Sequence, residues 1–300
     1  MILILTSKKV TAPKALHFLE LLGKNLSSNG SEFLIASFHD IEVYISNGNV
    51  KITILGKPLD TWSTIFPRKV GSHAGLTYIL ASQAEKLNIT FIDRFRGVTN
   101  DLTKLIQMYL FSLEGILIPK TYHCSSFNER QISNAIDFLG LPIVVKQCNT
   151  SKGKGVLLAK DRTELESAIN RLKETDPRKE IILQEFIENS FEYRIFVTGT
   201  TVAVAEKKTR DSDEQFRNNV HLGAVEEFIA IETVNESILN AALAAARTTN
   251  IQVAGVDVVL DVHGNPIVFE VNSCPGFTQD EEISDEIRHL SAYLTSCEKR

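Results

Sequence analysis

The sequence predicts a protein of mixed α/β and α+β class, organised as three lobes in a chain of 300 residues. Two patterns support this. Residues 1–98 alternate strand-like and helix-like stretches, which is typical of a small α/β lobe. Residues 99–187 and 188–300 instead group several strands around a few helices, as α+β lobes do. A chain of this length can bury the cores of two or three compact units.

Short apolar runs define the first lobe. Strands are expected where Val, Ile and Leu gather, over residues 1–6, 32–37, 42–45, 50–55, 63–68 and 89–92. Helices are expected over residues 12–26 and 75–86. The run Met1–Thr6 is too short for a secretory signal, and Lys8-Lys9 follow it instead of preceding it. We therefore interpret it as a first buried strand.

The second lobe is predicted to open with two helices. Asn100 or Asp101 can cap a helix over residues 102–114, and a second helix covers residues 129–139. A further helix follows its cap, Asp161. Strands are expected over residues 142–147, 156–160 and 180–187.

The third lobe combines two hairpins with an alanine-rich helix. The first hairpin pairs residues 192–198 with 201–208, and the helix covers residues 236–248. A valine-rich hairpin over residues 254–272 comes next.

Composition excludes several classes of function. The chain is 43% apolar with a net charge of −5, which gives no electrostatic reason for nucleic acid to be the main partner. No apolar run approaches the length of a membrane span, so no membrane partner is expected. The four cysteines are scattered without metal-ligand spacing. Reduced thiols and a cytoplasmic location are the favoured interpretation.

The valine-rich hairpin carries three oxygen-bearing side chains. If His263-Gly264 form the loop, Asp257 lies directly opposite Glu270, although Asn265-Pro266 could lengthen the turn. Asn272 shares the face of Glu270. Two carboxylates that face each other across a ladder repel, and a divalent cation removes the repulsion. These ligands suit Mg²⁺, with Mn²⁺ as an alternative, whereas two solvated acids on an exposed face are the other interpretation.

A glycine-rich loop joins two predicted strands of the second lobe. It contains Ser151, Lys152, Gly153 and Gly155, so its backbone can approach an anion and its lysines add positive charge. It is neither a Walker A loop nor a dinucleotide fingerprint, because a strand follows it. A flap over a triphosphate and a flexible hairpin tip are the two alternatives.

Two lysines and one connecting strand are further candidates. Lys146 ends a buried strand just before this loop, where we favour contact with phosphate over snorkelling to solvent. Lys104 lies in the first turn of a helix, and a solvated lysine is its default interpretation. The backbone of Glu185-Phe186 can hold an adenine ring, although an ordinary crossing strand is the simpler interpretation.

Polar residues in the third lobe can bind carboxylate or phosphate. Arg194 shares a strand face with Glu192, so an ion pair between them is the alternative to ligand binding. Arg217 and Asn219 lie in a loop with few apolar residues, which suits polar recognition. His221 is a candidate base on pattern alone, and we expect no essential histidine.

The order of these features resembles that of the ATP-grasp carboxylate–amine ligases, and most of all the RimK type, the ribosomal-protein glutamate ligases. The resemblance spans about residues 60–277. Its motifs are Pro142-Ile-Val-Val-Lys146, Leu183-Gln-Glu-Phe-Ile187, Phe216-Arg-Asn-Asn219, Val253-Ala-Gly-Val-Asp257 and Glu270-Val-Asn-Ser-Cys-Pro-Gly276. The resemblance implies an ATP-grasp fold, in which an N-terminal α/β lobe precedes two α+β lobes that clasp ATP.

The resemblance also implies residue roles. The lysines and the flap would contact the phosphates, and residues 185–186 would contact the adenine. Glu192, which is commonly Asp in the family, would contact the ribose. The implied nucleotide-binding set is Lys104, Lys146, Ser151, Lys152, Gly153, Gly155, Glu185, Phe186, Glu192, Arg194, Arg217 and Asn219. The implied catalytic set is Lys146, Arg217 and Asn219, and the implied ligands of two Mg²⁺ are Asp257, Glu270 and Asn272.

Two segments depart from the family pattern. The flap appears as Thr150-Ser-Lys-Gly-Lys-Gly155 instead of a Gly-Thr-Gln-Gly-like sequence. The His-Arg-Gly-Gly run appears as His221-Leu-Gly-Ala224, with Leu222 replacing an arginine near the acceptor side. These changes concern glutamate-transferring specificity more than ATP binding.

The implied activity is that of an ADP-forming ligase that makes an amide, or an ester, through an acyl phosphate on a peptide or protein. One alternative is macrocyclisation of a ribosomal precursor peptide. Another is a nucleotide-binding regulatory protein without turnover. The expected partners are ATP and a peptide or protein that supplies the carboxylate or the amine, and we expect a homo-oligomer.

Overall fold

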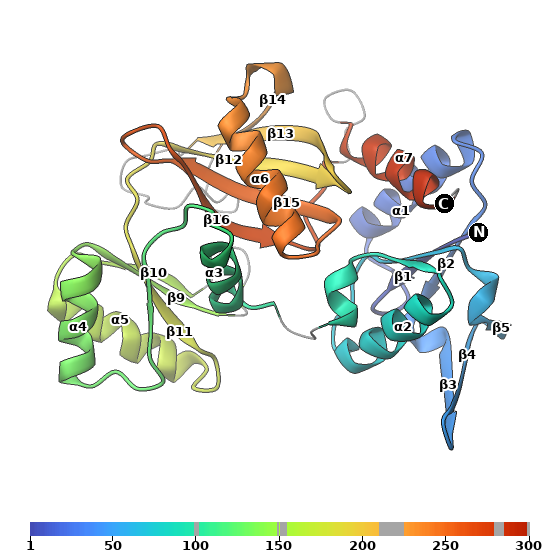
Figure 1. Ribbon diagram of the computed structural model, residues 1–300, viewed down its shortest axis with the longest axis horizontal. Helices are drawn as coiled ribbons and strands as arrows, with labels where there is room; N and C mark the ends of the chain where they lie inside the picture. Colours follow the sequence, from blue (N-terminus) through green and yellow to red (C-terminus); the bar gives the residue numbers. More distant parts are fainter. Residues whose placement is uncertain (99–101, 149, 151–154, 210–224, 279–284, 299–300) are drawn as a thin grey trace.

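The computed structural model describes the chain except residues 99–101, 149, 151–154, 210–224, 279–284 and 299–300. Figure 1 shows three lobes, each with its own sheet, and places the C-terminal helix against the first lobe. The predicted mixture of α/β and α+β lobes is confirmed. None of the described helices is both long enough and apolar enough to cross a bilayer.

The N-terminal lobe is built on a parallel sheet. Its elements are β1 (Ile2–Thr6), α1 (Pro13–Ser28), β2 (Phe33–Ser37), β3 (Ile41–Ser46), β4 (Asn49–Ile54), β5 (Lys57–Pro58), β6 (Thr64–Pro67), α2 (Ala74–Lys86) and β7 (Thr90–Phe91). The parallel sheet has the order β2-β1-β6-β7, and β3, β4 and β5 form a small antiparallel sheet. Alternate residues of β1 pack toward α1 and toward α2, which explains its continuous apolar sequence.

The second lobe is an antiparallel sheet with two packed helices. Its elements are α3 (Lys104–Leu113), β8 (Thr121–His123), α4 (Glu129–Leu139), β9 (Ile143–Gln147), β10 (Val156–Ala159), α5 (Arg162–Thr175) and β11 (Ile181–Glu185). The sheet order is β10-β9-β11-β8. Apolar residues of α4 and α5 pack on β9 and β11 (Figure 1). Asp161 caps α5 as predicted.

The third lobe is a five-stranded antiparallel sheet. Its elements are β12 (Phe191–Thr198), β13 (Thr201–Thr209), β14 (Val225–Ile229), α6 (Glu236–Thr248), β15 (Val253–Leu260), β16 (Pro266–Asn272) and α7 (Glu286–Glu298). The strand order is β14-β13-β12-β15-β16. One face packs on α6 and α3 through Ile195, Val256 and Val258. The other face packs against the first lobe at one end, through Phe196 and Val253, and carries the charged residues Arg194 and Asp257 further along.

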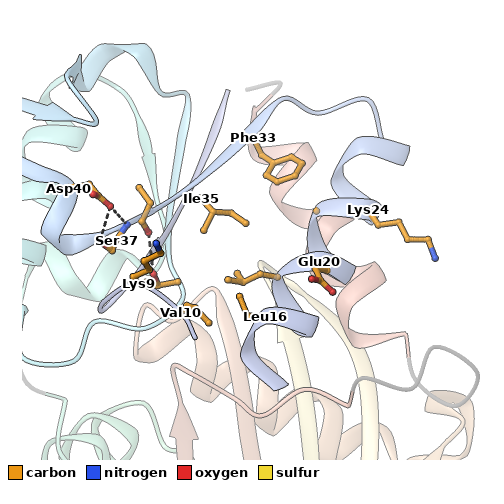
Figure 2. Close-up of a pocket in the computed structure, with 13 residues that line it drawn as sticks. Lys9, Val10, Leu16, Glu20, Lys24, Phe33, Ile35, Ser37 and Asp40 are labelled. Carbon is orange, nitrogen blue, oxygen red and sulfur yellow. Dashed lines mark hydrogen bonds between the residues drawn. The ribbon is translucent and has the colours of Figure 1, made fainter. Parts of the chain in front are cut away.

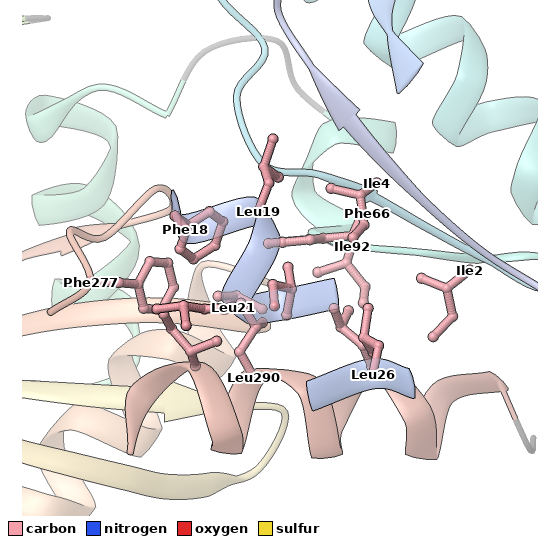
Figure 3. Close-up of a cluster of buried hydrophobic side chains, with 14 of the residues drawn as sticks. Ile2, Ile4, Phe18, Leu19, Leu21, Leu26, Phe66, Ile92, Phe277 and Leu290 are labelled. Atoms are coloured by element: carbon pink, nitrogen blue, oxygen red, sulfur yellow. The ribbon is translucent and has the colours of Figure 1, made fainter. Parts of the chain in front are cut away.

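A shared core joins the first and third lobes. Figure 3 shows Phe18 and Leu21 of α1 packed with Phe277 and with Leu290 of α7. Phe196 on β12 belongs to the same cluster. The C-terminal helix therefore ties the two lobes together.

Polar contacts reinforce this junction. The Asp93 carboxylate accepts hydrogen bonds from the N–H groups of Gln252 (2.8 Å) and Val253 (2.9 Å), at the start of β15. Burial raises the pKa of Asp93 to about 6, and the charge of Arg96 opposes that rise. The strand that carries Asp257 is thus anchored at its first residue by the N-terminal lobe.

One prediction about local structure is wrong, and two strands were not predicted. The cap of α3 is Thr103, whose hydroxyl accepts from the N–H of Ile106 (3.3 Å), and not Asn100 or Asp101. The strands β8 and β14 were not predicted. A strand is predicted from a run of apolar residues. β8 has only the three residues Thr121–His123, and β14 contains the two acids Glu226 and Glu227, so neither strand has such a run.

Candidate active site

Three charged side chains form a row across the third sheet. Arg194 on β12 is the register partner of Asp257 on β15, which is the partner of Glu270 on β16. Opposed residues of antiparallel strands project from the same face. This face is opposite to the one that Ile195 and Val256 bury against α6. The predicted pairing of Asp257 with Glu270 is confirmed.

A β-bulge brings Glu270 to this face. Asp257 pairs with Glu270, but the next pair toward the turn is Val258 with Val268, so Phe269 is the extra residue on β16. A bulge shifts the alternation of side chains by one position. Val268 can therefore face the core while Glu270 faces the row.

The turn of this hairpin differs from the predicted one. The loop spans residues 261–265 instead of His263-Gly264 alone. The Asp261 carboxylate closes it by accepting from the N–H groups of His263 and Asn265, both at 2.8 Å. The loop is thus the lengthened form that the sequence left open, and not the two-residue turn. The longer loop and the bulge change the register by one residue in opposite directions, so Asp257 still pairs with Glu270.

Arg194 neutralises Asp257 through a bidentate ion pair. Nε lies 2.7 Å from Oδ1, and Nη2 lies 2.8 Å from Oδ2. Burial alone would raise the pKa of Asp257, but the Arg194 guanidinium holds that pKa below its usual range. The alternative in which Arg194 pairs with Glu192 is therefore wrong. The arginine has a partner on the neighbouring strand, which the chain reaches only after α6.

Glu270 and Asn272 complete a group that we call the acidic site, which consists of Asp257, Glu270 and Asn272. Lys104, the first residue of α3, forms an ion pair with Glu270. Nδ2 of Asn272 donates to Oδ2 of Asp257 (3.2 Å) and to Oε1 of Glu270 (3.1 Å). One amide and the cations Lys104 and Arg194 thus hold the two carboxylates together.

The donor set fits a divalent cation with oxygen ligands. Two carboxylates are present, and a half-turn of the Asn272 amide would direct Oδ1 instead of Nδ2 toward them. In the described part of the chain, no group of three or more His, Cys, Asp or Glu side chains is arranged to hold a metal. Ligands from outside the protein would therefore complete the coordination shell of the cation. Mg²⁺ commonly binds in this way, through one or two carboxylates, water and substrate phosphates.

Lys146 on β9 adds a cation from the second lobe. Its Nζ lies 4.9 Å from the ring centre of Phe269, the bulge residue. Burial, and then the nearby charge of Lys104, lowers the pKa of Lys146 to about 8. Burial also lowers the pKa of Lys104. A buried ammonium group is costly to keep charged, so an anionic ligand would stabilise Lys146, and also Lys104 in addition to its ion pair with Glu270.

The acid expected at the ribose belongs to the same group of charges. Burial raises the pKa of Glu192, and the negative charge of Asp257 acts in the same direction, while Lys146 opposes it. The structure thus brings together Lys104, Lys146, Glu192, Arg194, Asp257, Glu270 and Asn272.

The residues expected at the adenine lie at the end of β11. The Glu185 carboxylate accepts from the N–H of Lys120 (2.7 Å), and the Glu185 N–H donates to the Lys120 carbonyl (3.1 Å). Phe186 follows the strand directly. Glu185 is thus held by the segment before β8, and its described hydrogen bonds do not reach the acidic site.

The flap and the polar loop fall mostly in the undescribed ranges. Ser151, Lys152, Gly153, Arg217 and Asn219 lie outside the described residues, and so does His221. Gly155 is described and has a φ of +69°, and a Cβ there would lie 3.1 Å from the Cβ of Gln147. Glycine is therefore strongly favoured at this position, directly before β10.

Two contacts that hold the acidic site were not predicted. The buried Gln107 of α3 bonds to both backbone groups of Val271. Arg68 donates from Nη1 to Sγ of Cys274 (2.7 Å) and from Nη2 to the carbonyl of Pro275 (2.7 Å), and so holds the loop after Asn272. A polar residue on the buried face of a predicted helix is the one signal that could have singled out Gln107.

A separate groove lies in the N-terminal lobe. Figure 2 shows it between α1 and β2, with apolar side chains such as Leu16, Phe33 and Ile35 in its lining. The groove has a volume of about 760 Å³. No expected site residue that the structure describes lines this groove. The candidate site is therefore the charged face of the third sheet.

Comparisons with known proteins agree with this geometry. The family model of the RimK-like ATP-grasp domain matches residues 99–287. A "Probable alpha-L-glutamate ligase" of Cellvibrio japonicus (strain Ueda107) is 30% identical over 255 residues, which cover 83% of this chain and 81% of that protein. A "Probable alpha-L-glutamate ligase 2" of Shewanella sp. (strain W3-18-1) is 32% identical over 228 residues, 75% of this chain and 73% of that protein.

Solved structures show the same fold. The ATP-grasp ligase PsnB, complexed with minimal precursor, Mg and ADP, superposes with a TM-score of 0.75 at 16% identity, covering 100% of this chain and 98% of that chain. The macrocyclase MdnC from Microcystis aeruginosa MRC, bound with precursor peptide MdnA, has a TM-score of 0.67 at 15% identity, covering 98% and 99%. The ATP-grasp fold expected from the resemblance is confirmed, and the chain belongs to the RimK-like ATP-grasp ligase family.

Proposed function

We propose that this enzyme joins a carboxylate of a peptide or protein to an amine. ATP would phosphorylate the carboxylate, which gives an acyl phosphate and ADP. The amine would then attack the carbonyl carbon and expel inorganic phosphate, which leaves an amide; a hydroxyl nucleophile would leave an ester. The observation that carries the proposal is the acidic site with Lys104 and Lys146 beside it, since phosphoryl transfer depends on positioning and on neutralisation of charge.

Each described residue has a task in this scheme. Lys146 and Lys104 would contact the phosphates, and Lys104 would exchange Glu270 for a phosphate oxygen. Mg²⁺ held by the acidic site would withdraw charge from the phosphates. Glu192 would accept from the ribose hydroxyls, and the backbone of residues 185–186 would hold the adenine. Among the residues outside the described part, we assign phosphate contacts to Ser151, Lys152, Gly153, Arg217 and Asn219.

The product of ATP identifies the mechanism. Enzyme, ATP and Mg²⁺ are incubated with pairs of candidate carboxylates and amines, and L-glutamate is the first amine because the relatives are named as glutamate ligases. A carboxylate labelled with heavy oxygen should transfer one label to inorganic phosphate, and ADP should form. AMP that carries the label would instead show adenylation and refute the proposal. Nucleotide binding without any product, whatever the pair, would favour the regulatory alternative.

Macrocyclisation of a precursor peptide is the second candidate. It is favoured by the similarity over the whole chain to PsnB and MdnC, both of which were solved with precursor peptides. Mass spectrometry of the product separates the two functions. Addition of an amino acid increases the mass of the peptide by one residue, whereas each internal link removes one water.

The affinity for ATP should fall above about pH 8. Lys146, whose pKa burial lowers to about 8, carries its charge below that pH, so the affinity should be flat there. Above it, binding must take up a proton, and the affinity should fall by up to about tenfold per pH unit. Calorimetric titration with ATP between about pH 7 and pH 10 measures the profile.

The control is Lys146→Arg, because a guanidinium stays protonated throughout this range. Its affinity should depend less on pH than that of the parent enzyme. Identical profiles for the two proteins would show that Lys146 does not contact the phosphates.

A further inference from the structure

We infer that Gln107 is a positioning residue that fixes the strand carrying two of the metal ligands. This inference rests on the proposed function of the acidic site. Gln107 is 6% exposed, and its side-chain amide faces the main chain of Val271. Nε2 donates to the Val271 carbonyl (3.1 Å), and Oε1 accepts from the Val271 N–H (2.8 Å).

The position of β16 explains why such a contact is needed. β16 is an edge strand of its sheet, so one side of its backbone lacks a neighbouring strand. The Gln107 amide offers one donor and one acceptor, as a peptide group does, and replaces that neighbour at a single residue. The residue it holds, Val271, lies between Glu270 and Asn272. The register shift at Phe269 breaks the ladder with β15 next to this point, which increases the need for support from the other side.

The same helix controls a side chain of the acidic site. Lys104, one turn before Gln107 on α3, pairs with Glu270. Met108 and Phe111 anchor α3 in the core of the third sheet, and Nε2 of Gln107 also donates to the Leu102 carbonyl (3.2 Å). Helix α3 therefore fixes the position of the main chain of β16 through Gln107. It also orients the carboxylate of Glu270 through Lys104. Groups that orient metal ligands typically change metal affinity by about 10–100-fold when they are lost.

The test is a Mn²⁺ titration in the presence of saturating ADP, in which electron paramagnetic resonance reports free Mn²⁺. Gln107→Leu leaves both backbone groups of Val271 without their partner, and its Kd for Mn²⁺ should rise by about 10–100-fold. Its affinity for ADP in the presence of EDTA should not change. Thr249→Val is the matched control, because this buried hydroxyl donates to Ala245 and Ala246 at the end of α6. It should lower stability without changing the Kd for Mn²⁺.

A second variant covers the case in which Gln107→Leu does not fold. Gln107→Glu keeps the acceptor for the Val271 N–H and loses the donor to its carbonyl, so its Kd for Mn²⁺ should rise by a smaller factor. An unchanged Kd in a folded Gln107 variant would overturn the inference and leave the proposed function intact. If the parent enzyme itself binds no Mn²⁺ in the presence of ADP, the assignment of the acidic site as a metal site is refuted. The inference about Gln107 is then refuted as well.

Discussion

Glu270→Gln should reduce the rate of ADP release by at least about 10²–10³-fold at saturating ATP and Mg²⁺, the loss expected when one preorganised electrostatic group is removed. The amide keeps the size of the side chain but removes a charged ligand and the partner of Lys104. Lys104 would then be free to bind phosphate, so the affinity for ATP without metal should not fall. Initial rates and calorimetry in EDTA measure these two quantities.

Two variants serve as controls. Glu227→Gln removes an exposed acid on β14 and should leave the rate unchanged. Cys274→Ala should keep most of the activity, because its thiol bonds to Arg68 and has no task in the chemistry. Turnover near that of the parent enzyme in Glu270→Gln would refute the assignment of the acidic site.

Arg194→Met should lower the free energy of unfolding by about 3 kcal/mol, because it leaves the buried carboxylate of Asp257 without its bidentate partner. For a chain of 300 residues, the loss corresponds to roughly 5 °C in Tm. Asn272 and Lys104 remain nearby, which keeps the expected loss at the lower end for a broken buried pair. Urea denaturation without metal measures it.

A double-mutant cycle isolates this ion pair. Asp257→Asn removes the charge that Arg194 compensates, so Arg194→Met with Asp257→Asn should be more stable than Arg194→Met alone. Strictly additive effects of the two substitutions would show that the pair is not coupled.

The acidic hairpin was largely predictable because strand periodicity depends only on local sequence. Alternation placed Asp257, Glu270 and Asn272 on one face, and the valine-rich runs marked the strands. The bulge at Phe269 and the loop after Asp261 could not be predicted, since each is stabilised by contacts that a strand pattern does not encode. Their effects on the register cancel, so the paired acids were identified correctly.

Contacts between distant segments could not be predicted. Arg194 meets Asp257 because β12 and β15 are neighbours, and sequence periodicity does not determine the order of strands in a sheet. For the same reason, neither the contact of Gln107 with β16 nor the packing of α7 on α1 was visible. Strand alternation and family motifs predicted the candidate site residues, whereas the contacts that position these residues are apparent only in the structure. The lobe boundaries at residues 98 and 187, the homo-oligomer and the cytoplasmic location stay predictions.

Anomalous diffraction from crystals grown with ADP and Mn²⁺ would locate the ion directly. The expected result is a manganese peak within about 2.2 Å of oxygens from Asp257, Glu270 and Asn272 and of a phosphate oxygen of ADP. Lys104 would then have moved from Glu270 to the phosphates. Manganese bound elsewhere, with Asp257 and Glu270 still paired to Arg194 and Lys104, would contradict the central claim that these residues form the metal site of the ligase.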